Sequence, residues 1–399
     1  MILKRYFFYL CLRIITIILV ANFYHPHDFE YGEIARHISS GRGYSRVYTE
    51  DGSPIPTSSH APLYPFFLAF FYKFKTTPLI YFLIQFFQAM ISTWTIYLIF
   101  KTSEYVFDKK TAKTAEFLTG IYPPFLYYCT KIVPTTFFLF FLSLVIFLIL
   151  TAKGKNLLHY SITGIVLGLT ILCDPIAMVI YPAILIIFLV NKSINFFRML
   201  LIVFFSLVVL LPWTIRNYNV HKAIVPVTTQ FGVNFWIGNN PNATGTDYFL
   251  VIDKDRYTLI TQTLNKDIQD SLTKISEVER SNFYFKQAID FIKKKPSIFA
   301  ILLIKKFYYY FWFAPTNIYI SPDDRYRRFY IPIYLVVLVC GILGIIIAIN
   351  QKCEVLLILT VQLFISAIYI FSHVGLLRYR MPVELYLLMF SAFFIKRLR

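Results

Sequence analysis

The sequence predicts an all-α, polytopic integral membrane protein with about ten transmembrane helices. Of its 399 residues, 57% are hydrophobic and only 15% are charged, whereas about 25% of the residues of a typical soluble protein are charged. Apolar runs of roughly 17–25 residues, the length at which a helix crosses a bilayer, recur along nearly the whole chain. No composition shift or internal repeat divides the chain, so residues 1–399 are expected to form a single membrane domain.

Hydropathy and charge predict how the chain crosses the membrane. The first apolar run is interpreted as a retained anchor and not a signal peptide, because no small-residue cleavage site follows it. With the N-terminus in the cytoplasm, every cytoplasmic turn carries Lys or Arg, as the positive-inside rule requires. The predicted spans are 6–22, 78–100, 112–129, 134–151, 158–173, 175–190, 197–213, 329–349, 354–372 and 382–396.

Two segments are expected outside the membrane on the extracytoplasmic side, 23–77 and 214–328, the second with a helical pattern around 276–294. Within them, the apolar runs 62–74 and 297–313 are interpreted as interfacial helices, since the first is short and Lys305 and Lys306 split the second.

Ionisable residues are nearly absent from the middles of the second to eighth spans. Arg13 is the main exception, and it is expected to extend toward the cytoplasmic face. An ion-coupled transporter would carry ionisable groups near the midplane, where they are costly and therefore functional. Six of the seven histidines and most of the acidic residues lie outside the spans, so chemistry is expected at the outer face.

The net charge of +18 does not indicate nucleic-acid binding, because basic cytoplasmic turns and contact with anionic lipids account for it. The five cysteines lack CxxC spacing and predict neither a disulfide framework nor a thiolate metal site. In "HPHD" (25–28), His25, His27 and Asp28 could ligate a metal, but short His-rich stretches at a membrane exit are more often unmetallated. No cofactor or metal is predicted, and a divalent metal stays open.

The stretch "HDFEYGEIARHISSGRGYS" (27–45) places three carboxylates close after the first span. Asp28 stands where a helix begins, so it can be a simple N-cap, and Glu30 and Glu33 can complement the helix dipole. Asp28 also follows the span by only about six residues, at the lipid–water boundary. A carboxylate there can take a proton from the hydroxyl of an amphiphilic substrate.

Several stretches in order resemble the GT-C membrane glycosyltransferases, in particular the branch of the protein O-mannosyltransferases and lipid A aminoarabinose transferase. The resemblance covers nearly the whole chain, and it lies more in the order of the motifs than in any one of them. The stretches are 27–45, "APLYPFFLAFFY" (61–72), "IYPPFLYY" (121–128), "PWTIRNYNVHKAIVPVTTQFGVNFWIGNNPNATG" (212–245) and "RYRMPVELY" (378–386).

The resemblance implies a GT-C fold and transfer of a single sugar from a polyprenyl-phosphate donor to an acceptor hydroxyl at the outer membrane face. It makes Asp28 the general base on that hydroxyl. Supporting roles are expected for Glu30, Tyr31, Glu33, Asn239 and Asn240. The two asparagines belong to "GNNPNATG" (238–245), which is interpreted first as a tight turn and second as an acceptor-side loop.

Cationic side chains at headgroup depth are needed to hold the donor phosphate. Arg378 and Arg380 are the candidates: Pro382 biases Met381 toward an extended backbone, and if this extends to Arg378, both guanidiniums point the same way. Arginine binds phosphate oxygens bidentately. The alternative is that both anchor the last span in anionic headgroups.

Two positions depart from the family pattern. Thr135 stands where relatives often carry an acidic residue, and His60 stands where they often carry Lys before the Pro-rich segment. The first weakens the case for a second carboxylate. His60 is kept as a phosphate contact, which needs it protonated or acting as a neutral donor.

The expected partners are a polyprenyl-phosphate-sugar donor, a glycan, lipid or protein acceptor, and membrane lipids, with no nucleic acid. The expected location is the cell (cytoplasmic or inner) membrane, with the site facing away from the cytoplasm. The alternatives are a lipid or sugar transporter or flippase without catalysis, and a non-catalytic assembly partner of envelope machinery.

The predicted topology can be tested with a single cysteine. A Gly52→Cys variant in the first outer segment should react with a membrane-impermeant maleimide added outside intact cells. Labelling only after the cytoplasmic side is opened would contradict the assignment of 23–77 to the outside.

Overall fold

The computed structural model of the protein describes residues 2–21, 23–24, 26–47, 52–191, 195–246, 268, 271–272, 275–314, 327–374 and 377–398. Helices dominate these parts of the chain. The α-helices among them are α1 (Ile2–Val20), α2 (Phe29–Ser39), α3 (Leu63–Tyr72), α4 (Pro78–Val106), α5 (Lys109–Ile121), α6 (Pro123–Tyr128), α7 (Thr135–Leu150), α8 (Leu157–Cys173), α9 (Ile180–Asn191), α10 (Phe196–His221), α11 (Phe231–Gly238), α14 (Glu277–Lys294), α15 (Pro296–Phe311), α16 (Arg327–Asn350), α17 (Leu356–Phe371) and α18 (Met381–Arg397).

Short 3₁₀ turns, η1 (Pro175–Val179) and η3 (Leu377–Tyr379), precede α9 and α18. The all-α prediction needs one correction, because β1 (Ser45–Val47) and β2 (Pro54–Pro56) form a small antiparallel pair with Ser45 opposite Pro56. The pair lies directly after α2.

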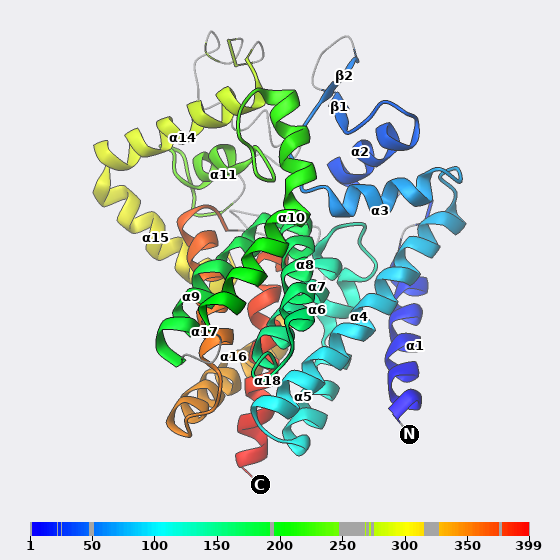
Figure 1. The fold of residues 1–399 in the computed structure, drawn as a ribbon, viewed down its shortest axis with the longest axis vertical. Coiled ribbons are helices and arrows are strands. Elements are labelled where there is room, and N and C mark those ends of the chain that lie inside the picture. The colour runs from blue at the N-terminus through cyan, green and yellow to red at the C-terminus, as the bar shows by residue number, and fades with distance from the viewer. Residues whose placement is uncertain are drawn as a thin grey trace.

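The elements separate along the long axis of the molecule (Figure 1). Both termini lie at one end. The opposite end holds α2, the two strands, α3, α11, α14 and the end of α10, with most of the apolar helices between. Segments 23–77 and 214–328 were both predicted outside, and their described parts meet at this end. The predicted topology requires this arrangement.

The helix ranges agree with most of the predicted apolar runs. By length and composition, α4, α10 and α16 are long and apolar enough to cross a membrane, and there are shorter apolar helices over 63–72, 135–150, 157–173, 175–190 and 356–371. The chain is therefore a multi-pass membrane protein, and the count of ten spans stays a prediction.

One predicted span is not a single helix. The run 112–129 is broken into α5 and α6 at Tyr122, whose backbone is extended at ψ 118°. Pro123 and Pro124 follow at the start of α6. Proline restricts the residue before it to extended conformations, so the break follows from the sequence "YPP".

The expectation that Arg13 extends toward the cytoplasmic face is wrong. Its side chain is fully buried. Its Nε donates to Ser92 Oγ at 2.8 Å, and its Nη1 donates to the carbonyl of Gly120 at 3.1 Å. These bonds join α1 to α4 and α5, whereas Nη2 of Arg13 is buried without a hydrogen-bond partner among the described residues.

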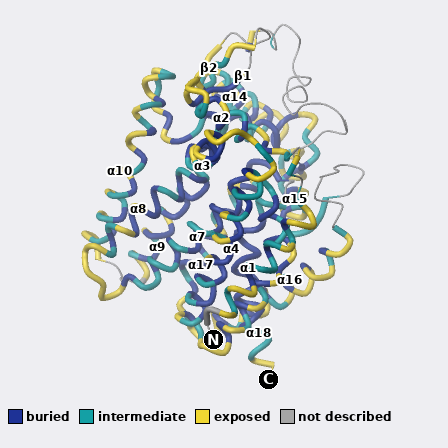
Figure 2. Tube along the Cα trace, turned by 90° about the vertical axis from the view of Figure 1, so that its right-hand side faces the viewer, coloured by how far each residue is buried: buried dark blue, intermediate teal, exposed yellow. Residues whose placement is uncertain are grey.

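Glycines set the closest helix contacts. A Cβ at Gly164 would lie 2.5 Å from the carbonyl oxygen of Ile202, which places α8 directly against α10. A Cβ at Gly344 would lie 2.1 Å from the carbonyl oxygen of Phe390, between α16 and α18. Close approach through small residues is characteristic of helices packed in membranes. Figure 2 shows exposed segments along α10, whose outward side chains include Phe204 and other large apolar residues, as a lipid-facing surface requires.

Candidate functional site

A cavity of about 530 Å³ lies where the two outer segments meet the bundle. Its wall is built by the start of α2, residues 59–61, the start of α7, the α8–η1 junction, residues 226–237, the end of α17 and η3. Four predicted site residues line it, namely Glu30, Tyr31, His60 and Arg378. Asp28, Glu33, Arg380, Asn239 and Asn240 are not among its lining residues.

Arg378 brings a guanidinium to this cavity. Within the described parts of the chain, no carboxylate forms an ion pair with it. Its guanidinium carbon lies 5.4 Å from the ring centroid of Tyr379, the next residue. A guanidinium at a cavity wall with no carboxylate at ion-pair distance is suited to an anionic ligand.

Asp174 also lines the cavity, and the sequence analysis did not single it out. It lies between α8 and η1, where its Oδ1 accepts a hydrogen bond from the N–H of Ile176 at 3.1 Å. Burial raises the pKa of Asp174 to about 6, while the Ile176 N–H and Arg378 act in the opposite direction. The sequence feature that could have indicated Asp174 is its place in "LCDPI", where it is an acidic residue in the one-residue gap between two apolar runs.

Tyr31 and His60 face each other at the α2 side of the cavity. Their ring centroids lie 4.8 Å apart in an edge-on arrangement. The imidazole Nδ1 of His60 is 2.9 Å from the hydroxyl of Ser59. Together with Glu30, the cavity therefore contains carboxylate, imidazole, phenol and guanidinium groups, which are able to transfer protons and to bind an anion.

Asp28 lies on another side of α2. It is 8% exposed, and its Oδ2 accepts hydrogen bonds from Arg36 Nη1 at 2.5 Å and from the hydroxyl of Tyr72 at 2.7 Å. The side chain packs over Gly32, where an added Cβ would lie 1.8 Å from Asp28 Oδ2. Asp28 precedes the first residue of α2, but its side chain makes no capping hydrogen bond. The carboxylate is held by an ion pair and a phenol instead.

Glu33 is occupied by the strand pair. Its Oε2 lies 3.0 Å from Arg46 Nε, and its Oε1 accepts from the N–H of Val47 at 2.8 Å. These contacts hold β1 against α2.

The prediction that Arg378 and Arg380 share an extended backbone is wrong. Residues 377–379 form the 3₁₀ turn η3, and Pro382 lies in the first turn of α18, where proline is favoured. Arg380 is 4% exposed. Its Nε lies 2.6 Å from Glu384 Oε1, and its Nη1 donates to the carbonyl of Trp312 at 2.9 Å. This guanidinium is paired inside the protein, whereas that of Arg378 lies at the cavity.

Asn239 and Asn240 lie in the predicted tight turn after α11, and both are buried. Asn240 Nδ2 donates to the carbonyl of Trp236 at 2.9 Å, and Asn239 Nδ2 donates to that of Phe371 at 3.0 Å. Asn239 Oδ1 accepts from the ammonium of Lys306 at 2.9 Å.

Lys306 was expected to mark an interfacial helix, but its side chain is fully buried. Its Nζ donates to Asn239 Oδ1 and to the carbonyls of Gly238, Phe371 and Ser372 at 2.9–3.2 Å. Burial lowers the pKa of Lys306 to about 7. Its hydrogen bonds tie α15 to the turn after α11 and to the end of α17.

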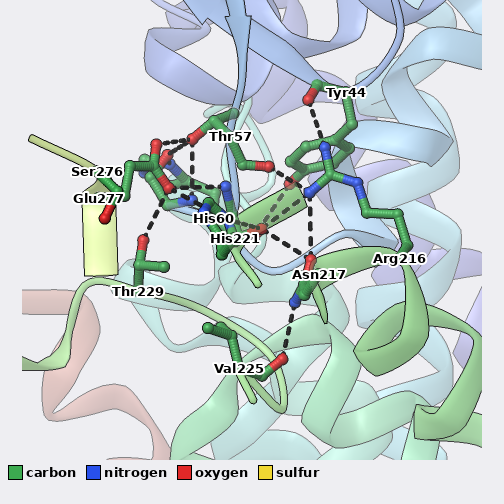
Figure 3. Close-up of polar contacts among 12 residues, drawn as sticks. Tyr44, Thr57, His60, Arg216, Asn217, His221, Val225, Thr229, Ser276 and Glu277 are labelled. Carbon is green, nitrogen blue, oxygen red and sulfur yellow. Dashed lines mark hydrogen bonds and ion pairs between the residues drawn. The ribbon is translucent and has the colours of Figure 1, made fainter. Parts of the chain in front are cut away.

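A polar network behind His60 joins the two outer segments (Figure 3). The carboxylate of Glu277 accepts from Thr57 Oγ1 at 2.5 Å, from the Ser58 N–H at 2.9 Å and from Thr229 Oγ1 at 3.0 Å. Arg216 donates to the carbonyl of Thr57 at 2.6 Å. Because Thr57 is 220 residues away from Glu277, no local sequence pattern indicates this contact.

Among the described residues, no group of three or more His, Cys, Asp or Glu side chains could hold a metal ion. His27 is exposed and lies beside Phe29, with ring centroids 6.0 Å apart. His25 lies outside the described residues, so its position is not compared.

Residues 59–215 match the family model described as dolichyl-phosphate-mannose-protein mannosyltransferase. The comparison with curated proteins by sequence gives no match. The matched segment begins at the cavity wall beside His60 and ends in α10, so it includes α3 to α9.

Solved structures of an archaeal oligosaccharyltransferase show the same fold over nearly the whole chain. The apo oligosaccharyltransferase of Archaeoglobus fulgidus superposes with a TM-score of 0.60 at 13% identity, covering 99% of this chain and 50% of that one. The same organism's AglB in complex with an inhibitory peptide and a dolichol-phosphate gives a TM-score of 0.54 at 13% identity, with 98% and 50% covered. ArnT from Cupriavidus metallidurans bound to undecaprenyl phosphate gives 0.46 at 14% identity, with 96% and 77% covered.

The predicted resemblance is confirmed for the fold, and the family model supports it over residues 59–215. The chain spans about half the length of the oligosaccharyltransferase that it matches. The cavity lies between the first outer segment and the later outer segment. Asp174 lies within the matched segment, whereas Arg378 lies outside it.

The network of Figure 3 predicts that Glu277 stabilises the contact between the two outer segments. Glu277→Gln leaves one acceptor oxygen for three donors, so it should destabilise the packing of residues 57–60 by about 1–3 kcal/mol. Glu279→Gln is the matched control, because it lies in the exposed capping box of the same helix, where Gln also serves. Thermal unfolding and limited proteolysis should show a loss for Glu277→Gln alone. Equal stability of the two variants would contradict the network's structural importance.

Proposed function

We propose that the protein is a membrane glycosyltransferase that transfers a single sugar from a polyprenyl-phosphate-linked donor to an acceptor hydroxyl at the outer membrane face. The acceptor is an envelope lipid, a polysaccharide or a protein. The observation that carries the proposal is the cavity in which Arg378, without an ion pair in the described chain, lies with Glu30 and Asp174. The family match, whose description names a dolichyl-phosphate-mannose donor, supports it.

In the proposed reaction, the acceptor oxygen forms a bond to the anomeric carbon while the bond from that carbon to the phosphate oxygen breaks. The acceptor proton passes to a carboxylate, and the phosphate keeps the electron pair of the broken bond. Negative charge therefore grows on the phosphate during transfer. Arg378 stabilises this charge, since its planar guanidinium can donate to two phosphate oxygens.

Asp28 is the proposed base on the strength of the resemblance. It is already ion-paired with Arg36, so it must exchange this partner, or move with it, when the acceptor arrives. Catalytic hydrogen bonds often tighten only in the substrate complex. Glu30 is the second candidate, because it is the carboxylate of the same turn that lines the cavity in this structure.

The base is tested by three charge-neutralising variants. Asp28→Asn should reduce sugar transfer at least about 100-fold, because general-base catalysis is worth roughly 10²–10⁴-fold, with donor binding nearly unchanged. Glu30→Gln should be milder. Glu33→Gln is the matched control, since Glu33 is held by Arg46 away from the cavity. Transfer is measured in membranes with a polyprenyl-phosphate sugar.

The opposite ranking would replace Asp28 by Glu30 as the base. If the wild-type protein moves the lipid-linked sugar across the membrane without joining it to any acceptor, the transporter alternative holds and the enzyme proposal fails.

The phosphate contact is tested by Arg378→Lys. This variant keeps the positive charge but removes the planar fork, so transfer should fall at least about tenfold, equivalent to roughly 1.4 kcal/mol of transition-state stabilisation. Arg328→Lys, at an exposed position in the first turn of α16, should transfer sugar at the parental rate. Parental activity of Arg378→Lys would reduce Arg378 to a headgroup anchor.

A further inference from the structure

Asp174 and Arg378 place opposite charges on the wall of the same cavity. They interact electrostatically without forming an ion pair in the described structure. Asp174 also influences Tyr31 and Tyr369, which line the cavity too. A phosphate bound by Arg378 is therefore within electrostatic range of a carboxylate.

The proposed reaction changes the charge of the ligand. The donor is a phosphodiester, which carries one negative charge. When the bond to the sugar breaks and the phosphate keeps the electron pair, the carrier becomes a phosphomonoester. A monoester carries about 1.5 to 2 negative charges at pH 7.

A carboxylate repels a ligand in proportion to the ligand's charge. Asp174 therefore opposes the spent carrier about twice as strongly as the donor, while Arg378 attracts both. A lone guanidinium would favour the more highly charged spent carrier and would leave the site blocked by its own product.

We infer that Asp174 is a specificity-determining residue that favours the sugar-linked phosphodiester over the spent polyprenyl monophosphate and so promotes product release. This inference rests on the proposed function, because it assumes that a lipid phosphate binds at Arg378. It concerns only the charge of Asp174 and assigns no proton transfer to it.

The alternative is that Asp174 only caps η1 through its hydrogen bond to the N–H of Ile176. Asparagine is about as good an N-cap as aspartate, so Asp174→Asn removes the charge and keeps the cap. Asp174→Glu keeps the charge and weakens the cap. The two variants separate the electrostatic role from the structural one.

The experiment measures equilibrium binding of two probes to the full-length purified protein at pH 8. At this pH, which is well above the pKa of about 6, the Asp174 carboxylate is ionised. The probes are a polyprenyl monophosphate and its methyl phosphodiester, with the uncharged polyprenol as baseline. Asp108→Asn is the matched control, since Asp108 is also an aspartate N-cap, at the start of α5, which lies at the end of the molecule opposite α2 (Figure 1).

Asp174→Asn should tighten binding of the monophosphate by about tenfold and of the diester by about threefold, as expected for twice the charge. Asp174→Glu and Asp108→Asn should preserve the parental ratio of the two dissociation constants. The same change for both probes in Asp174→Asn, or no change, overturns the inference and leaves the proposed function standing. If neither phosphate binds better than polyprenol to the wild-type protein, the phosphate site at Arg378 fails, and the inference fails with it.

Discussion

The buried ion pair between Arg380 and Glu384 is the constraint on which the cavity end of the helix bundle depends. A buried guanidinium is tolerated only when its charge and its N–H groups are matched. Here Glu384 supplies the charge, the hydroxyl of Tyr330 accepts at 3.0 Å, and the ring centroid of Tyr334 lies 3.8 Å from the guanidinium carbon. Tyr122, at the break between α5 and α6, donates to the other oxygen of Glu384 at 2.9 Å. The pair thus joins α16, α18 and the α5–α6 junction at one point, two residues from the cavity arginine.

The walls of the cavity are held by similar pairings of charges with backbone oxygens and hydroxyls. Glu277 and Arg216 connect the first outer segment to the second, and Lys306 connects α15 to the end of α17. Each of these charges is buried or half-buried and used within the protein, so its loss would leave uncompensated donors or acceptors. Arg378 differs from these residues. It carries a guanidinium like Arg380, but it forms no ion pair with a carboxylate in the described chain. The proposed function is assigned to the one of these two arginines that makes no ion pair in the described chain.

Much of the fold could be predicted from the sequence, because membrane helices are encoded locally by runs of apolar residues. The ranges of α4, α8 and α17 agree with the predicted runs to within a few residues at most ends. The prediction failed where the same local sequence is compatible with two positions of a side chain. Arg13 could reach the headgroups or find partners inside the bundle, and only the position of Ser92 on α4 decides for the second. Lys306 presented the same choice. The two prolines indicate the α5–α6 break, but the hydropathy of the run 112–129 led to its prediction as one span.

The site was less predictable, because a site depends on which face of each element meets the cavity. Residues two apart on a helix lie on different faces, and in this structure Glu30 lines the cavity whereas Asp28 contacts Arg36 and Tyr72. One face of this turn packs against Tyr72 of α3, and the other face lines the cavity. Only the tertiary packing decides which of the two carboxylates reaches the cavity. The same reasoning applies to Asp174. Its local sequence indicates only a helix cap, and its charge reaches the cavity wall because η3 packs nearby in the folded chain.

A carboxylate near a phosphate-binding guanidinium weakens binding of the phosphate. A carrier lipid that must leave after each transfer benefits from weak binding of its spent form. The pairing of opposite charges at one wall is therefore consistent with turnover, whereas a site built for retention would hold cations alone.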